Sequence, residues 1–516
     1  MNVVFRVDSS SKIGTGHVIR CKTLARALKK KGCEVLFISR DHNGNISKNL
    51  SDEGYEVLLL PASQDIIKDE SNYLDWLEVS QKIDADDTVC AIKSKKVDLL
   101  IVDHYALDKE WEDAVQPYVD KLMVIDDLAN RKHSCDILLD QNFSNDAQYR
   151  YKNLIDNKCV TFFGPEYALL NSAYTNYKER KNYSKMNNRV LIFMGGSDNE
   201  NITLKLLNIF KKNKFLDIEI DIVLGINYSN KDKLIDEANS REFTNIYASK
   251  PHLADLMARA DIAIGAGGVT TWERMSMGLP SIVISVAENQ EHICKELSEA
   301  DLITYIGKSQ DFNKKIVSST LSNILKDTKH LNNQSIKCKS LVDGLGTNRI
   351  VEYLLPTKKG QLNTRIANKD DAYILYNMVN EKKVRSNSIN SDMIDLTDHL
   401  NWFNLTLEST ESIIYIYEAE NTPIGQIRFD KKENGTYIDY SLDVIARGRG
   451  LATDILRKGI EIYNNVKPEE IIAIVKKENI PSLKAFQKLG FIQSNEEKNI
   501  EKFSLPKGIQ MKSYES

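Results

Sequence analysis

The chain of 516 residues has few cysteines, and nothing in their placement suggests pairing. There are seven, an odd number, with no C-x-x-C spacing and none in the last third of the sequence. This excludes a disulfide scaffold or a zinc site as the basis of the fold, and it predicts reduced thiols in a cytoplasmic protein. We accordingly expect no metal cofactor. The cysteines are residues 21, 33, 90, 135, 159, 294 and 338.

The sequence also lacks a strong excess of charge and any long hydrophobic run. Its formal net charge is -4, so no basic patch for nucleic acid or a membrane surface is predicted. No apolar run reaches membrane-spanning length, and no signal-peptide pattern precedes the first apolar strand. A chain of this length is too long for one core, and about three domains are expected. We expect small-molecule partners; a weak oligomer is one possibility, and the sequence leaves the oligomeric state open.

Glycines, by contrast, gather at the ends of apolar strands, and the most informative example lies within residues 265–290. An apolar strand at 262–264 ends in Gly-Ala-Gly-Gly, and Thr270 and Thr271 then open a short helix before a second apolar strand. Gly267 and Gly268 allow backbone N–H groups to approach an anion, the threonine hydroxyls can cap or donate, and the helix start adds positive partial charge. This pattern predicts a phosphate-binding loop.

Glu273 lies in the first turn of that helix, where a carboxylate can accept both hydroxyls of a ribose. The loop and the carboxylate together predict a nucleoside diphosphate held by its pyrophosphate and its sugar. The alternative is an ordinary tight turn between strand and helix. That alternative is weakened because similar loops occur elsewhere in the chain.

Two further loops have the same design. The first follows an apolar strand at residues 3–7 and places His17 in the first turn of the next helix. Because ligands bind at the carboxyl ends of strands in open α/β sheets, a functional role is favoured for this histidine. The second loop follows the strand at residues 190–194. The binding residues expected in these two loops are Gly14, Gly16, Gly195, Gly196 and Ser197.

The alternation of strands and helices predicts two doubly wound α/β domains with parallel sheets, over residues 1–165 and 166–356. Facing glycine loops would form a cleft between them. A helix over residues 332–355 is expected to end this part, and a polar linker at 356–360 follows it. The expected strands are 3–7, 35–39, 97–103, 122–127, 137–142, 190–194, 218–224, 245–248, 262–265 and 281–285.

The last third differs, because its strands at 413–418, 423–430, 436–444 and 471–476 lie closer together. This spacing predicts an antiparallel sheet with helices on its faces, an α+β domain over residues 361–516. Its sharpest motif is RGRGLA at residues 447–452, immediately before a helix, where arginines and backbone N–H groups can hold a pyrophosphate. We expect each of the two parts joined by the linker to fold and work alone.

Residues 362 to about 500 resemble the GNAT superfamily of acetyl-coenzyme A dependent N-acetyltransferases, whose R-x-x-G-x-G/A loop matches Arg447, Gly450 and Ala452. The resemblance implies that the coenzyme A pyrophosphate lies on the loop at 447–452, the thioester beside the strand at 442–444, and the pantetheine near Asn479. Acetyl-coenzyme A would be the co-substrate. The residues assigned to it in this way are Leu442, Val444, Arg447, Gly448, Arg449, Gly450, Ala452, Asn479 and Phe486.

One departure from the superfamily is Phe486, where many members carry a tyrosine that protonates the leaving thiolate. Another group or water would then supply the proton. Residues 384–389 and 399–403 resemble the acceptor-side region of sugar-nucleotide acyltransferases. Within them Trp402 could stack on a base or sugar, although a core position is favoured.

Residues 1 to about 355 resemble the UDP-sugar hydrolases of pseudaminic acid synthesis, which remove UDP from UDP-2,4-diacetamido-2,4,6-trideoxy-β-L-altropyranose. That family is similar in fold to GT-B glycosyltransferases, with the nucleotide on the second half. The segments that carry the resemblance are RVDSSSKIGTGHVIRC, IDDLANRKHSCDILLDQN, GPEYALL, MGGSDNENIT and the AGGVTTWER, LPSIV and AENQ blocks, in that order.

The hydrolase resemblance implies that water attacks the anomeric carbon with inversion while UDP leaves. His17 matches the catalytic histidine of that family. Asp8 is a second catalytic candidate, equally suited to bracing the first loop, and for Asp126 and Asp127 at the end of a strand bracing is favoured over catalysis. Glu288, Asn289 and Gln290 match a segment that contacts the sugar.

The two resemblances suggest one pathway. An N-acetyltransferase of pseudaminic acid synthesis acetylates the 4-amino group of UDP-4-amino-4,6-dideoxy-N-acetyl-β-L-altrosamine, and its product is the substrate of the hydrolase. Two alternatives remain open. The first part could be a glycosyltransferase that uses an alcohol acceptor, and the last domain could be a non-catalytic acyl-coenzyme A sensor or transfer another acyl group.

Overall fold

The computed structural model describes residues 1–62, 73–177, 188–196, 198–497 and 499–507. The chain divides into two compact units, unit 1 (Met1–Thr347) and unit 2 (Asn348–Ser516). Helix α13 (Gly346–Leu354) crosses the point of division. The predicted domain limits at residues 165, 356 and 361 remain predictions.

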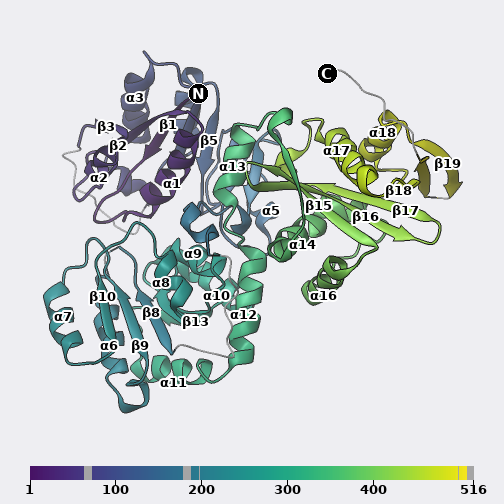
Figure 1. Cartoon of the computed structure of the whole chain (residues 1–516). Coiled ribbons are helices and arrows are strands. Elements are labelled where there is room, and N and C mark those ends of the chain that lie inside the picture. The colour runs from purple at the N-terminus through teal and green to yellow at the C-terminus, as the bar shows by residue number, and fades with distance from the viewer. Residues whose placement is uncertain (63–72, 178–187, 197, 498, 508–516) are drawn as a thin grey trace. The chain divides into compact units, whose positions relative to one another are not determined.

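The first half of unit 1 is a seven-stranded sheet in the order β3-β2-β1-β4-β5-β6-β7, and all neighbouring strands are parallel. Figure 1 shows α1, α2 and α3 around its strands. The strands are β1 Asn2–Val7, β2 Glu34–Arg40, β3 Glu56–Leu60, β4 Leu99–Asp103, β5 Leu122–Ile125, β6 Ile137–Asp140 and β7 Val160–Phe163. The helices are α1 Gly16–Lys30, α2 Ser47–Asp52, α3 Gln81–Ile92, α4 Lys109–Val115 and α5 Ala147–Arg150.

The second half of unit 1 is a six-stranded parallel sheet in the order β10-β9-β8-β11-β12-β13. Its strands are β8 Arg189–Phe193, β9 Glu219–Val223, β10 Thr244–Tyr247, β11 Ile262–Ala266, β12 Ser281–Ser285 and β13 Thr304–Lys308. Its helices are α6 Ile202–Phe210, α7 Lys231–Asn239, α8 Ala254–Arg259, α9 Thr270–Ser276, α10 Glu291–Glu299, α11 Lys314–Ile324 and α12 Thr328–Leu341.

Helices cover both faces of each sheet, which agrees with the continuous apolar sequences of the central strands. Every residue of β4, β11 and β12 is buried, because helices pack on both sides of a parallel sheet. Around the second sheet, one apolar core forms beneath α6 and α11, and another forms beneath α8, α9 and α10. The predicted pair of doubly wound sheets is confirmed.

The strand orders place a topological switch point in each sheet. In the first sheet, the connections from β1 and β4 leave in opposite directions, and in the second sheet those from β8 and β11 do so. Open α/β sheets bind ligands outside the carboxyl ends of strands at such points. The glycine loops found in the sequence follow β1, β8 and β11, so all of them lie at switch points.

The helix predicted over residues 332–355 is wrong, because the chain forms two helices there, α12 and α13. Gly344 has a φ of 80° between them, a backbone conformation that ends a helix. The carboxylate of Asp343 accepts a hydrogen bond from the backbone N–H of Leu345 at 2.9 Å, which closes the turn. Strands β3, β7 and β13 were not predicted.

Unit 2 contains a seven-stranded sheet in the order β14-β15-β16-β17-β18-β20-β19. The prediction of an antiparallel sheet is wrong at one place, because β17 and β18 pair in parallel. The strands are β14 Asn363–Ile366, β15 Ser412–Ala419, β16 Thr422–Lys432, β17 Gly435–Leu442, β18 Ile471–Lys476, β19 Ile492–Glu497 and β20 Ile500–Leu505.

Helices cover both faces of this sheet, as expected for the α+β domain. Figure 1 shows α14 and α16 on one side of β15, β16 and β17, and α17 and α18 on the other. Side chains of α14 and α16 join β15 in one apolar core. The helices are α14 Ala372–Asn380, α15 Lys382–Asn387, α16 Leu396–Glu408, α17 Leu451–Val466 and α18 Ile480–Lys488.

Candidate active sites

The loop after β1 is a tight turn that delivers His17 to the start of α1. The backbone N–H of Gly14 donates to the carbonyl of Ser10 at 2.9 Å, and Gly14 has a φ of 78°, which favours glycine. The hydroxyl of Ser10 accepts from the backbone N–H groups of Lys12 and Ile13 at 3.1 and 2.9 Å. The turn therefore fixes where α1 begins, and His17 is its second residue.

His17 is paired with Asp103, the last residue of β4. Its Nδ1 lies 2.6 Å from Oδ1 of the carboxylate. Because a carboxylate accepts and does not donate, Nδ1 carries the proton and Nε2 keeps its lone pair. The ring of Tyr105 meets the imidazole edge-on, with centroids 4.6 Å apart. The imidazole is thus held in one tautomer and one orientation, as in the histidine of a catalytic triad.

Arg20, one turn further along α1, holds the same carboxylate. Its Nε and Nη2 donate to Oδ2 and Oδ1 of Asp103 at 2.6 and 2.7 Å, and its Nη1 donates to Asp127 at 2.7 Å. Burial opposes ionisation of Asp103, but Arg20 and His17 keep its pKa well below the usual value. The hydroxyl of Tyr105 also donates to Asp127, at 2.7 Å. A fixed negative charge therefore faces the imidazole.

Of the acidic pair at the end of β5, Asp127 belongs to this network, while Asp126 braces the loop behind it. Asp126 is buried, and an oxygen of its carboxylate lies 2.8 Å from Arg131 and the other accepts from the backbone N–H of Ala129 at 2.9 Å. Further along the same edge, burial and the charge of Asp127 raise the pKa of Asp140 to about 7. The bracing role favoured from the sequence fits the contacts of Asp126.

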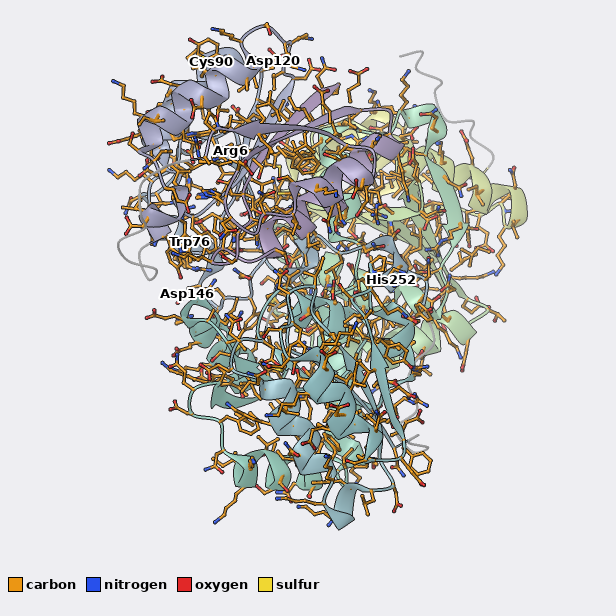
Figure 2. The ribbon with its side chains drawn as sticks, turned by 90° about the vertical axis from the view of Figure 1, so that its left-hand side faces the viewer. Arg6, Trp76, Cys90, Asp120, Asp146 and His252 are labelled. Carbon is orange, nitrogen blue, oxygen red and sulfur yellow. The ribbon has the colours of Figure 1, made fainter. Side chains whose placement is uncertain are left out.

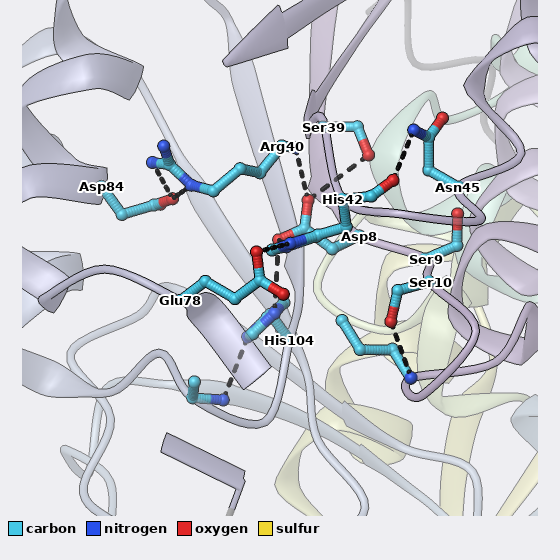
Figure 3. Close-up of polar contacts among 12 residues, drawn as sticks. Asp8, Ser9, Ser10, Ser39, Arg40, His42, Asn45, Glu78, Asp84 and His104 are labelled. Carbon is cyan, nitrogen blue, oxygen red and sulfur yellow. Dashed lines mark hydrogen bonds and ion pairs between the residues drawn. The ribbon is translucent and has the colours of Figure 1, made fainter. Parts of the chain in front are cut away.

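Asp8 lies in a buried polar cluster beneath the loop (Figure 3). Its carboxylate contacts Arg6 at 2.5 Å and accepts from the backbone N–H of Arg40 at 2.7 Å, and His42 and His104 lie 3.4 and 3.3 Å away. Burial opposes its ionisation, but Arg6 and the two histidines hold its pKa well below the usual value. Its side chain has no exposed surface. These contacts favour the bracing role over direct contact with substrate.

Arg6 joins this cluster to α3. Its side chain is fully buried and donates to both oxygens of Asp84 on α3, at 3.0 and 2.6 Å. Figure 2 shows Arg6 among the interior side chains of the first half of unit 1, with the exposed Cys90 at its surface. Strand β1 is therefore tied to α3 by charged groups as well as by apolar packing.

The loop after β8 faces the loop after β1 within unit 1. Gly195 has a φ of 93°, and a Cβ on Gly196 would lie 3.3 Å from the hydroxyl oxygen of Thr15. A Cβ on Gly16 would lie 3.9 Å from a methyl group of Val269, in the loop after β11. The glycine loops predicted to share a cleft are therefore neighbours. Ser197 lies outside the described residues.

The loop after β11 is built around a buried arginine that the sequence did not reveal. Arg274 on α9 donates to the carbonyl of Ala266 at 2.9 Å and to the hydroxyls of Thr271 and Thr270 at 3.0 and 3.2 Å. Burial lowers its pKa to about 10, so it remains a cation at neutral pH. The threonines therefore do not cap α9, whose N-cap residue is Val269. Their hydroxyls hold the loop to the arginine below it.

Gly267 and Gly268 allow this loop to pass close to α10. A Cβ on Gly267 would overlap the thiol of Cys294 and lie 3.3 Å from Cβ of Gln290, whereas one on Gly268 would lie 3.6 Å from Nε2 of Gln290. The side chain of Gln290 also accepts from the backbone N–H of Val286 at 3.0 Å. Gln290 is thus a bracing residue of the loop.

The remaining residues expected to bind the sugar nucleotide differ in their exposure. Glu288 and Asn289 are exposed at the start of a short 3-10 helix, η6 (Glu288–Gln290). Glu273 lies in the first turn of α9, and burial raises the pKa of its carboxyl to about 7. Its contact with Tyr174 opposes that shift. Glu273 is therefore poised between neutral and ionised forms at physiological pH.

In unit 2, the parallel strands β17 and β18 pair only at their beginnings. The pairing runs from Thr436 with Ile471 to Ile438 with Ala473, although β17 continues to Leu442 and β18 to Lys476. The strands therefore part toward their carboxyl ends. Leu442 is half-buried and Val444 exposed beyond the opening, where the resemblance places the thioester.

The loop after β17 leads into the long helix α17. Gly448 and Gly450 have φ angles of 75° and 69°, and Gly450 is the N-cap residue of the helix, which then begins with Leu451 and Ala452. Arg447 is tied back to the strand through the carbonyl of Leu442 at 3.0 Å, and it pairs with Glu381 at 2.6 Å. The N–H groups of the first helical turn are the natural site for an anion.

The side chains of Asn479 and Phe486 both make contacts that stabilise the fold of unit 2. The side chain of Asn479 caps α18 by accepting from the backbone N–H of Ser482 at 3.4 Å. Phe486 is 2% exposed and packs against Phe491. The sequence did not reveal that Tyr440 on β17 contacts Ser482, with their hydroxyl oxygens 2.9 Å apart. These hydroxyls lie where β17 and β18 part.

The acceptor-side region contains one accessible aromatic ring. Trp402 on α16 is 38% exposed, and the guanidinium of Arg428 lies over its ring at 5.0 Å. His399 is buried, with Nε2 2.8 Å from the carbonyl of Ala372. The core position that the sequence favoured for Trp402 is therefore wrong, because the residue is partly exposed at the surface.

In residues 1–507, apart from the undescribed gaps, no three His, Cys, Asp or Glu side chains are grouped to hold a metal ion. Of the helices in the part of the chain that the structure describes, none has the length and apolar character to cross a membrane.

Two domain families match the chain. Residues 183–345 match the glycosyltransferase family 28 C-terminal domain, and residues 362–492 match the acetyltransferase (GNAT) domain. The chain therefore joins a domain of the kind found in GT-B glycosyltransferases to a GNAT acetyltransferase domain.

Three curated relatives extend this comparison. An uncharacterized protein of Methanocaldococcus jannaschii is 23% identical over 525 residues, which cover 95% of this chain and 96% of that protein. The spore coat polysaccharide biosynthesis protein SpsG of Bacillus subtilis is 23% identical and covers 69% of this chain, with 98% of its own length matched. The UDP-2,4-diacetamido-2,4,6-trideoxy-beta-L-altropyranose hydrolase of Campylobacter jejuni is 29% identical over 258 residues, 46% of this chain and 83% of that enzyme.

Solved structures are similar to each part. Acinetobacter baumannii MurG has a TM-score of 0.48 at 13% identity, covering 69% of this chain and 99% of its own. Spermidine N-acetyltransferase from Vibrio cholerae, in complex with CoA and spermine, has a TM-score of 0.27 at 14% identity, covering 29% of this chain and 96% of its own.

Proposed function

We propose that unit 1 hydrolyses UDP-2,4-diacetamido-2,4,6-trideoxy-β-L-altropyranose to UDP and the free sugar, with inversion. The observation that carries this proposal is the pair of His17 and Asp103 at the switch point of the first sheet, next to the glycine loops of the second. The Campylobacter jejuni relative is named for that hydrolysis and matches 46% of this chain.

The chemistry follows from the tautomer of His17. Its Nδ1 donates to Asp103, so Nε2 can take a proton from a water molecule. The water oxygen forms a bond to the anomeric carbon while the bond from that carbon to the phosphate oxygen breaks, and UDP leaves with the electron pair. A single attack from the face opposite UDP inverts the anomeric centre. Asp103 then stabilises the imidazolium.

The second half of unit 1 would hold the leaving group. Backbone N–H groups at Gly267 and Gly268, close to the start of α9, offer donors to the diphosphate, and buried Arg274 keeps that loop in shape. Gly195 and Gly196 would line the other side, and Glu273 would accept the ribose hydroxyls. Glu288 and Asn289 would reach the sugar.

We further propose that unit 2 transfers an acetyl group from acetyl-coenzyme A to the 4-amino group of UDP-4-amino-4,6-dideoxy-N-acetyl-β-L-altrosamine. The amine nitrogen forms a bond to the thioester carbonyl carbon between the parted strands, and the carbon–sulfur bond breaks. The nitrogen loses one proton and the sulfur gains one, so coenzyme A leaves as a thiol. Phe486 has none to give, whereas burial raises the pKa of Tyr440 and keeps its hydroxyl protonated. The product would be the substrate of unit 1.

One experiment tests both activities. The purified full chain is incubated with the UDP-4-amino sugar, with and without acetyl-coenzyme A, and the products are followed by NMR. We expect acetylation followed by release of UDP and an inverted free sugar only when acetyl-coenzyme A is present. If UDP is released only when an alcohol acceptor is added, unit 1 is a glycosyltransferase and the hydrolase proposal fails.

Replacing Asp103 should impair hydrolysis through His17. The change Asp103→Asn removes the charge behind the imidazole and allows the wrong tautomer, so we expect kcat to fall by about two to four orders of magnitude, because the comparable change behind the histidine of a catalytic triad costs about 10⁴-fold. Calorimetry should show unchanged affinity for UDP. The exposed Asp120, labelled in Figure 2, provides the control Asp120→Asn, which should keep full activity. An unchanged kcat and pH profile in Asp103→Asn would remove Asp103 from the mechanism.

Binding of UDP should depend on pH through Glu273. Its raised pKa of about 7 means that the carboxyl is mostly protonated at pH 6 and mostly ionised at pH 8, and only the ionised form accepts from both ribose hydroxyls. Binding therefore releases a proton, and affinity should rise about tenfold between these pH values. UDP itself titrates in this range, so the measurement is the difference between the wild type and Glu273→Gln. Identical pH dependence in the two proteins would show that Glu273 does not contact the ribose.

A further inference from the structure

The polar segment at residues 356–360, which precedes the acetyltransferase domain, is held by the buried carboxylate of Glu352. Glu352, near the end of α13, has a side chain that is 4% exposed. It accepts from the backbone N–H of Thr357 at 3.0 Å and from the hydroxyl of Thr357 at 2.6 Å. The residues that the sequence marks as a polar linker therefore begin with an anchored turn.

The same carboxylate holds the RGRG loop. Nη1 of Arg449 donates to Glu352 at 2.8 Å, and its Nη2 donates to the carbonyl of Thr357 at 2.9 Å. Arg449 thus joins the loop before α17 to the segment before the domain. All three residues belong to unit 2, so this arrangement is internal to the acetyltransferase unit.

Lys359 follows this anchored turn, and its side-chain ammonium lies close to Gly450. Its backbone is held by Lys458 of α17, whose ammonium donates to the carbonyls of Lys359 and Leu362 at 3.4 and 3.3 Å. A Cβ built on Gly450 would lie 3.4 Å from Nζ of Lys359. Lys359 is exposed, and no carboxylate in the described part of unit 2 forms an ion pair with it. Among the described residues of unit 2, Lys359 is therefore a cation at the N-cap of α17 with no carboxylate paired to it.

We propose that Lys359 binds the pyrophosphate of coenzyme A, so that the segment before the domain completes the acyl-coenzyme A site. The proposal rests on the proposed acetyltransferase function of unit 2. The first turn of α17 has N–H groups available to a diphosphate, and Lys359 adds a charge on the side of Gly450. The contacts of Glu352 and Arg449 hold that segment in place.

Calorimetric titration of the full chain with coenzyme A tests this assignment. We expect Lys359→Ala to weaken binding about tenfold, as for the loss of one charge-assisted contact to phosphate, and Lys359→Arg to keep most of the affinity. The neighbouring Lys358 is also exposed, so Lys358→Ala is a matched control that should bind as the wild type does. Equal affinities for Lys359→Ala and the wild type would overturn the proposal.

A second titration identifies the phosphate. With 3′-dephospho-coenzyme A, the weakening caused by Lys359→Ala should persist, because the pyrophosphate is still present. If the two proteins bind this analogue equally well, Lys359 does not bind the pyrophosphate and the proposal fails. If the wild type binds neither ligand, the acetyltransferase function of unit 2 fails instead, so the two failures are distinguishable.

Discussion

The change His17→Ala should lower the rate of UDP-sugar hydrolysis by about two to four orders of magnitude, the usual contribution of a positioned general base. The structure explains why no neighbour can replace it. Asp103 points its oxygens at His17 and Arg20, and Asp8 is buried with its own partners. The measurement is kcat from release of UDP, followed by NMR or a coupled assay.

Binding of UDP separates a catalytic effect of His17 from a structural one. We expect His17→Ala to bind UDP with the affinity of the wild type, because the proposed nucleotide contacts lie in the second half of unit 1. His330 on α12 is far from the loops in sequence, and its partly exposed imidazole lies 3.7 Å from Asp301, so His330→Ala is a control that should keep full activity. Near wild-type turnover in His17→Ala would exclude the proposed mechanism.

The change Gly450→Glu should abolish acetyl transfer. Its φ of 69° is strained for any residue with a Cβ, at a cost of about 1 kcal/mol. The larger effect comes from the carboxylate, which would place bulk and negative charge at the N-cap of α17 and could pair with Lys359. We expect no detectable binding of acetyl-coenzyme A by calorimetry, while hydrolysis by unit 1 remains.

Two further variants separate the effect of backbone strain from the effect of the added charge in Gly450→Glu. Gly450→Ala introduces the strain without the charge and should retain part of the affinity. Gly490, after α18, also has a positive φ of 90° and open space around its Cβ position, so Gly490→Glu carries a similar strain and the same charge away from the loop. It should still bind acetyl-coenzyme A. Normal binding by Gly450→Glu would show that the pyrophosphate lies elsewhere.

Local patterns were sufficient to predict the elements that carry the glycine loops. Strand β12 and strand β18 have the predicted bounds, and α1 begins where the turn before His17 indicated. These features depend on apolar runs, glycines and helix starts, which are encoded within a few residues. The break between α12 and α13 is encoded in the same way, by the pair Asp343-Gly344.

The side chains that contact His17 could not be predicted from local sequence patterns. Asp103 is 86 residues away from it in sequence and looked like any other acid at the end of a strand. Only the adjacency of β1 and β4 brings the two together. Arg20 was not singled out from the sequence, because charged residues on a helix usually face solvent, yet it is 3% exposed. The parallel pairing of β17 with β18 was also hidden, because strand spacing does not encode direction.

The predicted independence of the two parts now depends on where the chain is cut. A fragment that begins at residue 360 loses Glu352 and Thr357, the acceptors of Arg449. A fragment that begins at residue 348 keeps them, in agreement with the limits of unit 2. We expect only the longer fragment to retain the coenzyme A affinity of the full chain.

The buried charges beneath the first loop also bear on the uniqueness of the fold. Apolar side chains alone would pair β1 with its neighbours almost equally well in several alignments, because Val3, Val4 and Phe5 are interchangeable in a buried strand. A shift of one residue would turn Arg6 to the opposite face, away from Asp84, and break the buried ion pair between them. The buried charged cluster of Arg6, Asp8 and Asp84 thus favours a single alignment of β1 with its neighbouring strands. In that alignment, the end of β1 lies beside Asp103.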